Sequence, residues 1–174
     1  MKILVSACLV GDPVRYDGKA KPVGGIEALY QTHVVFKLCP EVAAGLPVPR
    51  DPAELNGTSI EILNKKVGGV FTKTGQSVTA EFLRGAQTTL AFCLDHGIHA
   101  AVLKERSPSC GLTQVYDGSH TGTIIPGTGL TAALLREAGI KVYSEDNFQE
   151  LLVDYKKIYD PCKTKNTGET IRQT

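Results

Sequence analysis

The sequence has 174 residues, about the length of one domain, with 42% apolar and 21% charged residues, the ordinary balance of a globular protein. Its 19 basic and 18 acidic side chains nearly cancel, so a broad basic surface for nucleic acid is not expected. No apolar stretch is long enough to cross a membrane, and the strand-like K-I-L-V after Met1 does not resemble a secretory leader, so we expect a cytoplasmic protein.

The first 57 residues predict two buried strands and little other regular structure. Lys2–Ala7 is an apolar, β-branched run that leads into Cys8, and His33–Leu38 is a second such run that leads into Cys39. A turn-rich segment and a short helix at about Ile26–Gln31 separate the two strands. From residue 40 to residue 57 the chain carries four prolines, which predict an extended loop.

Residues 58 to 97 predict a small hairpin followed by a long helix. Thr58–Leu63 alternates as an exposed strand would, and Lys66–Thr72 follows as its expected hairpin partner. The apolar spacing then changes to 4, 4 and 3 residues, which is one face of a helix that Ser77 or Thr79 caps and Gly97 ends. The apolar residues of this face are Phe82, Ala86, Leu90 and Cys93.

The last third of the chain predicts two more strands and two more helices. Ile98–Leu103 is a third buried strand, and Glu105–Thr113 is a loop. Thr131–Ala138 is expected to form a helix and Ile140–Tyr143 a fourth strand. Asp146 is the expected start of a final amphipathic helix. Its apolar positions are Phe148, Leu151, Leu152 and Tyr155.

Strands that alternate with helices predict a parallel sheet covered by helices on both faces. The expected fold class is therefore α/β: a single-domain, three-layer Rossmann-like fold with a mainly parallel sheet and a small β-hairpin excursion. We expect this domain to span residues 1–158. Residues 159–174 have almost nothing to bury and are expected to form a basic C-terminal tail.

Three of the five cysteines are predicted to meet at one edge of this sheet. Ligands of such sheets bind beyond the carboxyl ends of the strands. Cys8 ends the first strand, Cys39 ends the second, and Cys110 lies in the loop after the third. Cys93 falls on the apolar face of a helix, where a thiol packs as a small hydrophobic group, and Cys162 lies in the tail.

Several kinds of site fit three thiols at one edge. Three thiolates with an open fourth position suit zinc or an iron–sulfur cluster, and a [4Fe–4S] cube would keep one iron free as a Lewis acid. A cysteine phosphatase or arsenate reductase is an alternative, with Cys8 and Arg15 around a phosphate, but six residues separate them where that chemistry uses five. A dithiol redox pair, a phosphate- or sulfur-compound-binding module and inert buried thiols also stay open.

Polar side chains accompany the three cysteines. Glu41 follows Cys39 by two residues, and Ser107 and Ser109 lie three residues and one residue before Cys110. Carboxylates and hydroxyls beside a thiolate-bound metal suit proton transfer to a bound substrate. Further charged and aromatic residues near the cysteines, which we expect at the substrate, are Arg15, Tyr16, Asp17, Lys104 and Arg106.

Four ordered motifs run through the chain: S-A-C-L-V-G with V-R-Y-D-G, C-P-E-V with G-L-P-V-P-R, L-K-E-R-S-P-S-C-G, and T-A-A-L-L-R-E-A-G-I. Together they resemble the DUF523 family, whose characterised members are thiouracil desulfurases. The resemblance extends from about Lys2 to Glu145. It implies a [4Fe–4S] cluster held by Cys8, Cys39 and Cys110, which acts as a sulfur-seeking Lewis acid. The implied reaction is a non-redox hydrolysis of C=S to C=O in a thiolated pyrimidine, with release of hydrogen sulfide.

The same resemblance implies roles for individual side chains. The acid/base carboxylate carries over to Glu41, and a serine of S-P-S-C is implicated, for which we favour Ser107 over Ser109. Arg15, Lys104 and Arg106 are expected to hold a phosphate if the substrate is a nucleotide. We expect no C-terminal domain like that of the tRNA-acting relatives, and therefore a small thiolated base, nucleoside or nucleotide as partner and no nucleic acid or membrane. The sequence makes no prediction of the oligomeric state.

Overall fold

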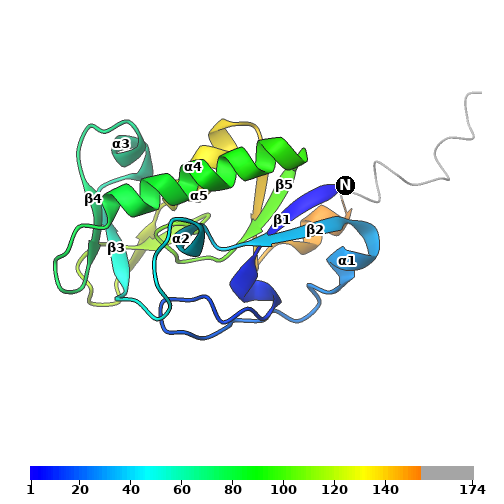
Figure 1. The fold of residues 1–174 in the computed structure, drawn as a ribbon, viewed down its shortest axis with the longest axis horizontal. Coiled ribbons are helices and arrows are strands. Elements are labelled where there is room, and N and C mark those ends of the chain that lie inside the picture. The colour runs from blue at the N-terminus through cyan, green and yellow to red at the C-terminus, as the bar shows by residue number, and fades with distance from the viewer. Residues whose placement is uncertain (154–174) are drawn as a thin grey trace, which may run out of the picture.

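A four-stranded parallel sheet forms the centre of the structure, which is a computed structural model that describes residues 1–153 (Figure 1). In spatial order its strands are β2 (Val34–Leu38), β1 (Lys2–Ser6), β5 (Ala100–Leu103) and β8 (Lys141–Ser144). Every neighbouring pair is parallel, and in the register of the two central strands Val5 lies opposite Val102. The central strands are buried on both faces, which explains why they occur in the sequence as unbroken apolar runs.

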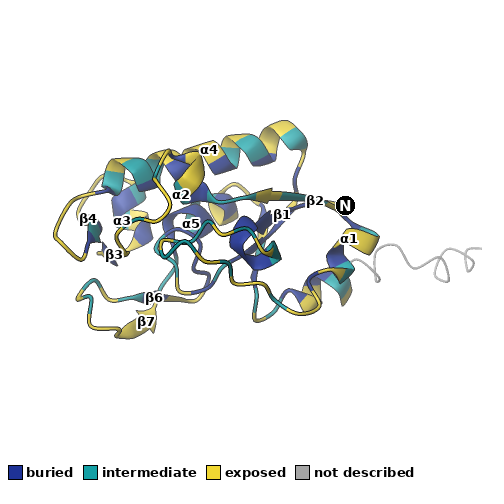
Figure 2. Cartoon of the chain, turned by 60° about the horizontal axis from the view of Figure 1, so that its bottom comes forward, coloured by how far each residue is buried: buried dark blue, intermediate teal, exposed yellow. Residues whose placement is uncertain are grey.

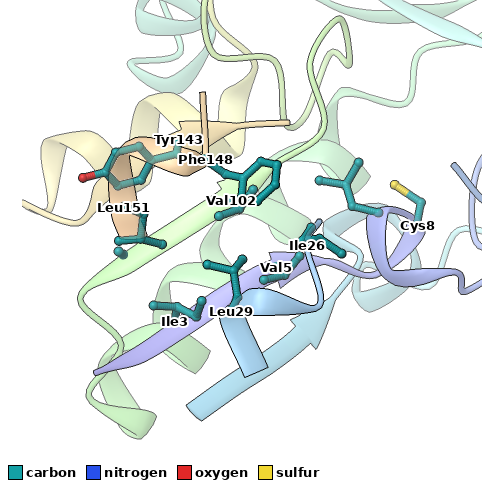
Figure 3. Close-up of a cluster of buried hydrophobic side chains, with 11 residues drawn as sticks. Ile3, Val5, Cys8, Ile26, Leu29, Val102, Tyr143, Phe148 and Leu151 are labelled. Carbon is teal, nitrogen blue, oxygen red and sulfur yellow. The ribbon is translucent and has the colours of Figure 1, made fainter. Parts of the chain in front are cut away.

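Helices cover both faces of this sheet. Ile3 and Val5 point to one face, where they share a buried cluster with Leu29 (Figure 3). Leu4 points to the other face, into a cluster that includes Leu135. The helices that supply these layers are α1 (Ala28–Thr32) on the first face and α4 (Thr79–His96) and α5 (Leu130–Glu137) on the second. The predicted α/β, Rossmann-like arrangement with a mainly parallel sheet is confirmed.

Two antiparallel hairpins stand outside the main sheet. One pairs β3 (Ala53–Asn56) with β4 (Gly69–Thr72), and the other pairs β6 (Gln114–Tyr116) with β7 (Ile124–Pro126). The second hairpin was not predicted, because its strands are only three residues long. All three residues of β7 are exposed (Figure 2), so burial imposes no apolar alternation on its sequence.

The strand predicted at Thr58–Leu63 is wrong, because these residues form helix α3 (Ser59–Leu63). Thr58 and Glu61 make a capping box, in which each side chain accepts a hydrogen bond from the other residue's backbone N–H. This local capping outweighs the two-residue alternation of the sequence. The hairpin excursion itself exists, but the strand near residue 70 pairs with β3.

The extended loop predicted from residue 40 to residue 57 is also wrong in two places. Besides β3, it contains the short helix α2 (Pro40–Ala43), with Cys39 at its N-cap. A proline at the first helical position loses no hydrogen bond, because that backbone N–H has no partner within a helix. Pro40 therefore begins a helix here where the density of prolines predicted irregular chain.

Helix α4 follows its predicted face closely and carries α2 on its surface. It ends at Gly97, whose φ of 62° is left-handed, as predicted. The predicted side-chain cap is wrong, because no side chain makes a capping hydrogen bond at the start of α4. The Thr79 hydroxyl instead accepts a hydrogen bond from the backbone N–H of Val70 at 2.9 Å. Gly85 lies under α2: a Cβ at this position would come within 2.5 Å of the Pro40 carbonyl oxygen. The missing side chain therefore allows α2 to approach the long helix.

The end of the described chain closes the first face of the sheet. Phe148 and Leu151 are buried in the cluster of Figure 3, and residues 149–153 are helical. Asp146, the predicted start of this helix, lies in the preceding turn. The predicted position Tyr155 and the predicted tail 159–174 lie outside the described residues. No helix within residues 1–153 is long and apolar enough to cross a membrane.

The contact beneath α2 yields a test of how this helix is positioned. Gly85→Ala should lower the free energy of unfolding by about 1–2 kcal/mol, because the new methyl group meets backbone rather than a movable side chain. This loss is expected despite a gain of about 1 kcal/mol in helix propensity. Urea unfolding measures it, with the exposed position Gln87→Ala on the same helix as the control. Unchanged or increased stability of Gly85→Ala would contradict the close packing.

Candidate active site

A pocket of about 320 Å³ lies at the carboxyl edge of the central sheet, and it brings three thiols together. Cys8 lies in the 3₁₀ turn η1 (Ala7–Val10) directly after β1, and Cys39 lies between β2 and α2. Cys110 lies in the loop that follows β5. All three line the pocket. Because β2, β1 and β5 are adjacent and parallel, their carboxyl ends meet at this edge.

The remaining cysteine of the described chain is separate from this pocket. Cys93 is fully buried on α4, in the apolar cluster on the second face of the sheet. Burial raises the pKa of its thiol to about 11. It packs as a small apolar side chain, whereas Cys162 lies outside the described residues.

Burial keeps the three pocket thiols protonated in the absence of a metal. It raises the pKa of Cys8 to about 11, and the neighbouring Cys39 thiol adds to this shift. The pKa of Cys39 is raised by burial as well. The pKa of Cys110 rises strongly, first through burial and then through Cys39 and Glu41. A metal that binds these sulfurs must therefore displace their protons.

The donor set of the pocket, three thiols, is compatible with an iron–sulfur cluster. Within residues 1–153, no three His, Cys, Asp or Glu side chains are placed to hold a single metal ion. All three thiols border a shared cavity, and an all-thiolate donor set is typical of iron–sulfur clusters.

Glu41 occupies the first turn of α2 and lines the same pocket. Its Oε2 lies 2.6 Å from Nη2 and 2.8 Å from Nε of Arg50. Arg50 closes the G-L-P-V-P-R motif but was not among the predicted site residues. The available signal was a single arginine at the end of a proline-rich loop, and nothing local connects it to a carboxylate nine residues earlier.

Ser107 also lines the pocket, and its hydrogen bonds determine where its proton points. Its Oγ accepts from the backbone N–H groups of Ser109 and Cys110, each at 3.1 Å. A hydroxyl has two acceptor positions and one donor, so both acceptor positions are used. The remaining proton is directed to Oε1 of Glu41 at 3.5 Å.

Two further hydroxyls near Cys110 make structural contacts, that of Ser109 in the same loop and that of Ser6 at the end of β1. Ser109 is 1% exposed, and its hydroxyl pairs with that of Thr131 at 2.8 Å, which ties the loop to α5. The Ser6 hydroxyl, missed in the sequence, accepts from the backbone N–H of Lys104 at 3.1 Å and donates to Cys110 Sγ at 3.7 Å. Of these, only Ser6 and Lys104 line the pocket together with Cys110.

Of the five residues expected at the substrate, four line the pocket and Asp17 does not. Arg15 and Tyr16 line the pocket, with the guanidinium 5.6 Å from the centroid of the tyrosine ring. Arg106 lines it with a left-handed φ of 60°. Asp17 is outside the lining and lies 3.4 Å from Nε of Arg15. The Lys104 ammonium is bound to the Glu145 carboxylate. The charged and aromatic lining residues that were not among the predicted site residues are Lys21, Arg50, Glu105 and Tyr116.

The loop after Cys8 does not form a phosphate cradle. A cradle needs backbone N–H groups that point at the ligand. The N–H of Asp12 donates to the Ala7 carbonyl at 3.1 Å, and the N–H of Val14 donates to the Asp12 carbonyl at 2.9 Å. The N–H of Arg15 donates to the Lys19 carbonyl at 3.3 Å. The geometry therefore does not favour a cysteine phosphatase or arsenate reductase.

Fold and site together define an α/β protein with three thiols gathered in one pocket at the carboxyl edge of a parallel sheet. The chain belongs to the 2-thiouracil desulfurase family, whose model matches residues 3–147. It is similar to the uncharacterized protein YbbK of Bacillus subtilis (strain 168), with 40% identity over 151 residues, 86% of this chain and 99% of the relative. It is also similar to the solved structure of the [4Fe-4S]-dependent thiouracil desulfidase TudS, a DUF523 protein. That match has 47% identity and a TM-score of 0.80, and it covers 90% of this chain and 98% of the other.

A buried carboxylate organises the loop that carries Cys110. Glu105 is 3% exposed, and its two oxygens accept from the backbone N–H groups of Leu112, Thr113 and Gln114 at 2.7–2.8 Å. The Thr113 hydroxyl donates a fourth hydrogen bond. Hydrogen bonds to a charged group are the stronger kind, so this carboxylate fixes the shape of the loop.

Glu105→Gln should therefore destabilise the fold. Its amide NH₂ replaces one acceptor oxygen and meets backbone donors, which should lower the free energy of unfolding by about 2–4 kcal/mol. Chemical denaturation of the metal-free protein measures the loss. The exposed Glu137→Gln on α5 is the matched control and should leave stability unchanged. Equal stability of the two variants would show that the Glu105 hydrogen bonds do not hold the loop.

Proposed function

We propose that this protein is a thiouracil desulfidase, which hydrolyses the C=S group of a thiolated pyrimidine to C=O and releases hydrogen sulfide. The observation that carries the proposal is that Cys8, Cys39 and Cys110 line one pocket together with Glu41. Membership of the 2-thiouracil desulfurase family and the similarity to TudS support the same reaction. Free thiols at the site are compatible with a reducing compartment such as the cytoplasm.

Cys8, Cys39 and Cys110 would hold a [4Fe–4S] cluster. When bound, the cluster would supply a sulfur-seeking Lewis acid, because three thiolates leave one iron without a protein ligand. The protein contributes the low polarity around the sulfurs, since Cys8 and Cys110 are only 7% and 5% exposed. It also supplies a hydrogen bond from Ser6 to Cys110, which stabilises negative charge on that sulfur.

Glu41 and Ser107 are the groups placed to move protons. Oε2 of Glu41 is occupied by Arg50, and Oε1 remains to take a proton from a water molecule in the pocket. Both acceptor positions of the Ser107 hydroxyl accept hydrogen bonds from backbone N–H groups. It therefore acts as a donor, either to Glu41 or to an acceptor atom of the substrate. We assign Ser109 to holding the loop, because its hydroxyl bonds to Thr131.

Substrate orientation falls to side chains on the open side of the pocket. Tyr16 is 43% exposed and borders the pocket, so its ring can stack on a flat pyrimidine. Arg15 and Arg106 can donate to a substrate oxygen or phosphate, and Lys104 adds positive charge, although Glu145 already holds its ammonium. Asp17 contributes through Arg15 rather than through direct contact with substrate.

Anaerobic purification tests the cluster. Protein made without oxygen should be brown, contain about four irons and four sulfides per chain, and release sulfide from 2-thiouracil. Cys8→Ala, Cys39→Ala and Cys110→Ala should each lose the visible absorbance, because each removes a ligand. Cys93→Ala should keep both the absorbance and the activity, since this thiol packs in the core. Colourless protein after anaerobic reconstitution would contradict the proposal.

The role of Glu41 is tested separately from cluster binding. Glu41→Gln should retain iron content and absorbance but lower turnover by at least about 100-fold, because the amide cannot accept the proton of water. Sulfide release and uracil formation measure the rate. Turnover close to that of the unaltered enzyme would remove Glu41 from the proton transfer and leave the cluster assignment intact.

A further inference from the structure

We propose that Arg50 is a positioning residue, which holds the carboxylate of Glu41 so that Oε1 alone faces Ser107 and the pocket. This inference rests on the proposed function, in which Glu41 handles the proton of the attacking water. Arg50 acts through Glu41 and does not itself contact substrate.

Both contacts from Arg50 to Glu41 reach the same oxygen. Nη2 lies 2.6 Å and Nε 2.8 Å from Oε2. The side chains of Arg50 and Glu41 are only 8% and 15% exposed, so water competes little for this ion pair and its charge-assisted hydrogen bond from Nε. A side-on pair that engaged both oxygens would leave neither available. Here Oε2 makes both contacts with Arg50, and Oε1 makes none with it.

The guanidinium is itself fixed by the main chain. Nη1 and Nη2 each donate to the Val14 carbonyl at 3.2 Å, and Nη1 also donates to the Pro47 carbonyl at 3.2 Å. Together with the Nε bond to Glu41, these bonds use four of the five N–H groups of an arginine side chain, and Nη2 also forms the ion pair with Oε2. The donors of Arg50 are thus directed mainly at the protein, so the geometry points to positioning rather than binding.

The Arg50–Glu41 pair also explains why an acceptor oxygen lies beside the Ser107 hydroxyl. Ser107 Oγ accepts hydrogen bonds from two backbone N–H groups. Its own proton can therefore only be donated, and it requires an acceptor oxygen on the free side of the hydroxyl. Oε1 of Glu41 fills that direction only while Arg50 retains Oε2. The three side chains thus form a chain of hydrogen bonds that runs from a buried cation to a hydroxyl at the pocket.

Arg50→Met and Arg50→Lys test this role in the cluster-loaded enzyme. Arg50→Met should keep the iron content and the KM for 2-thiouracil but lower kcat by about 100-fold, the cost of a carboxylate that is no longer held in place. Arg50→Lys retains a cation without the planar fork and should recover at least about fivefold of that loss. A raised KM, lost iron or a lysine variant no better than the methionine variant would overturn the proposal.

Arg84, on helix α4, supplies a matched control that also contacts the α2 segment. Its Nε and Nη2 donate to the Ala44 carbonyl at 3.2 and 2.9 Å, so it supports the end of α2 without a contact to Glu41. Arg84→Met should keep kcat within about twofold. If it lowered kcat as much as Arg50→Met, general loosening of α2 would explain both effects and the specific role of Arg50 would fall.

A crystal structure of Arg50→Met tests the positioning without turnover. The carboxylate of Glu41 should rotate, and the 3.5 Å separation between its Oε1 and Ser107 Oγ should lengthen beyond hydrogen-bonding distance. An unchanged carboxylate would overturn the inference. If the unaltered loaded enzyme released no sulfide from any thiolated pyrimidine, the proposed function would fail, and the crystal structure would still decide the role of Arg50.

Discussion

The structure depends on the parallel pairing of β1 with both β2 and β5. Parallel strands that lie side by side end at the same edge, so the residues that follow each strand are brought together whatever their distance in sequence. Cys8, Cys39 and Cys110 each follow one of these three strands. The buried sheet thus turns three separated positions into one set of thiols.

The segments after the strands owe their precision to contacts that do not belong to the sheet. Gly85 on α4 leaves room for the Pro40 carbonyl, which brings the first turn of α2 and its Glu41 to the pocket. Glu105 gathers the backbone N–H groups that follow the Cys110 loop. Arg50 then connects α2 with the loop at Val14. A close backbone approach and two buried charged groups therefore shape the site.

Much of the fold was predictable because its elements carry strong local patterns. The two central strands, β1 and β5, are buried apolar runs, and α4 has both a helical face and a terminal glycine. The errors fall where two local signals compete. A capping box outweighed the alternation at Thr58–Leu63, and a proline at the start of α2 began a helix inside an expected loop. Short exposed strands such as β7 carry no pattern that burial would impose.

The sequence by itself determined which chemical groups are available and which strand each one follows, because local periodicity encodes the strands and their order encodes a parallel sheet. It thereby selected the three cysteines and Glu41. Only the tertiary structure decided that Arg50 binds one oxygen of Glu41. It also decided that Ser107 lies toward the pocket and Ser109 toward α5. Those choices depend on side-chain directions across long-range contacts, and no local pattern in the chain records such directions.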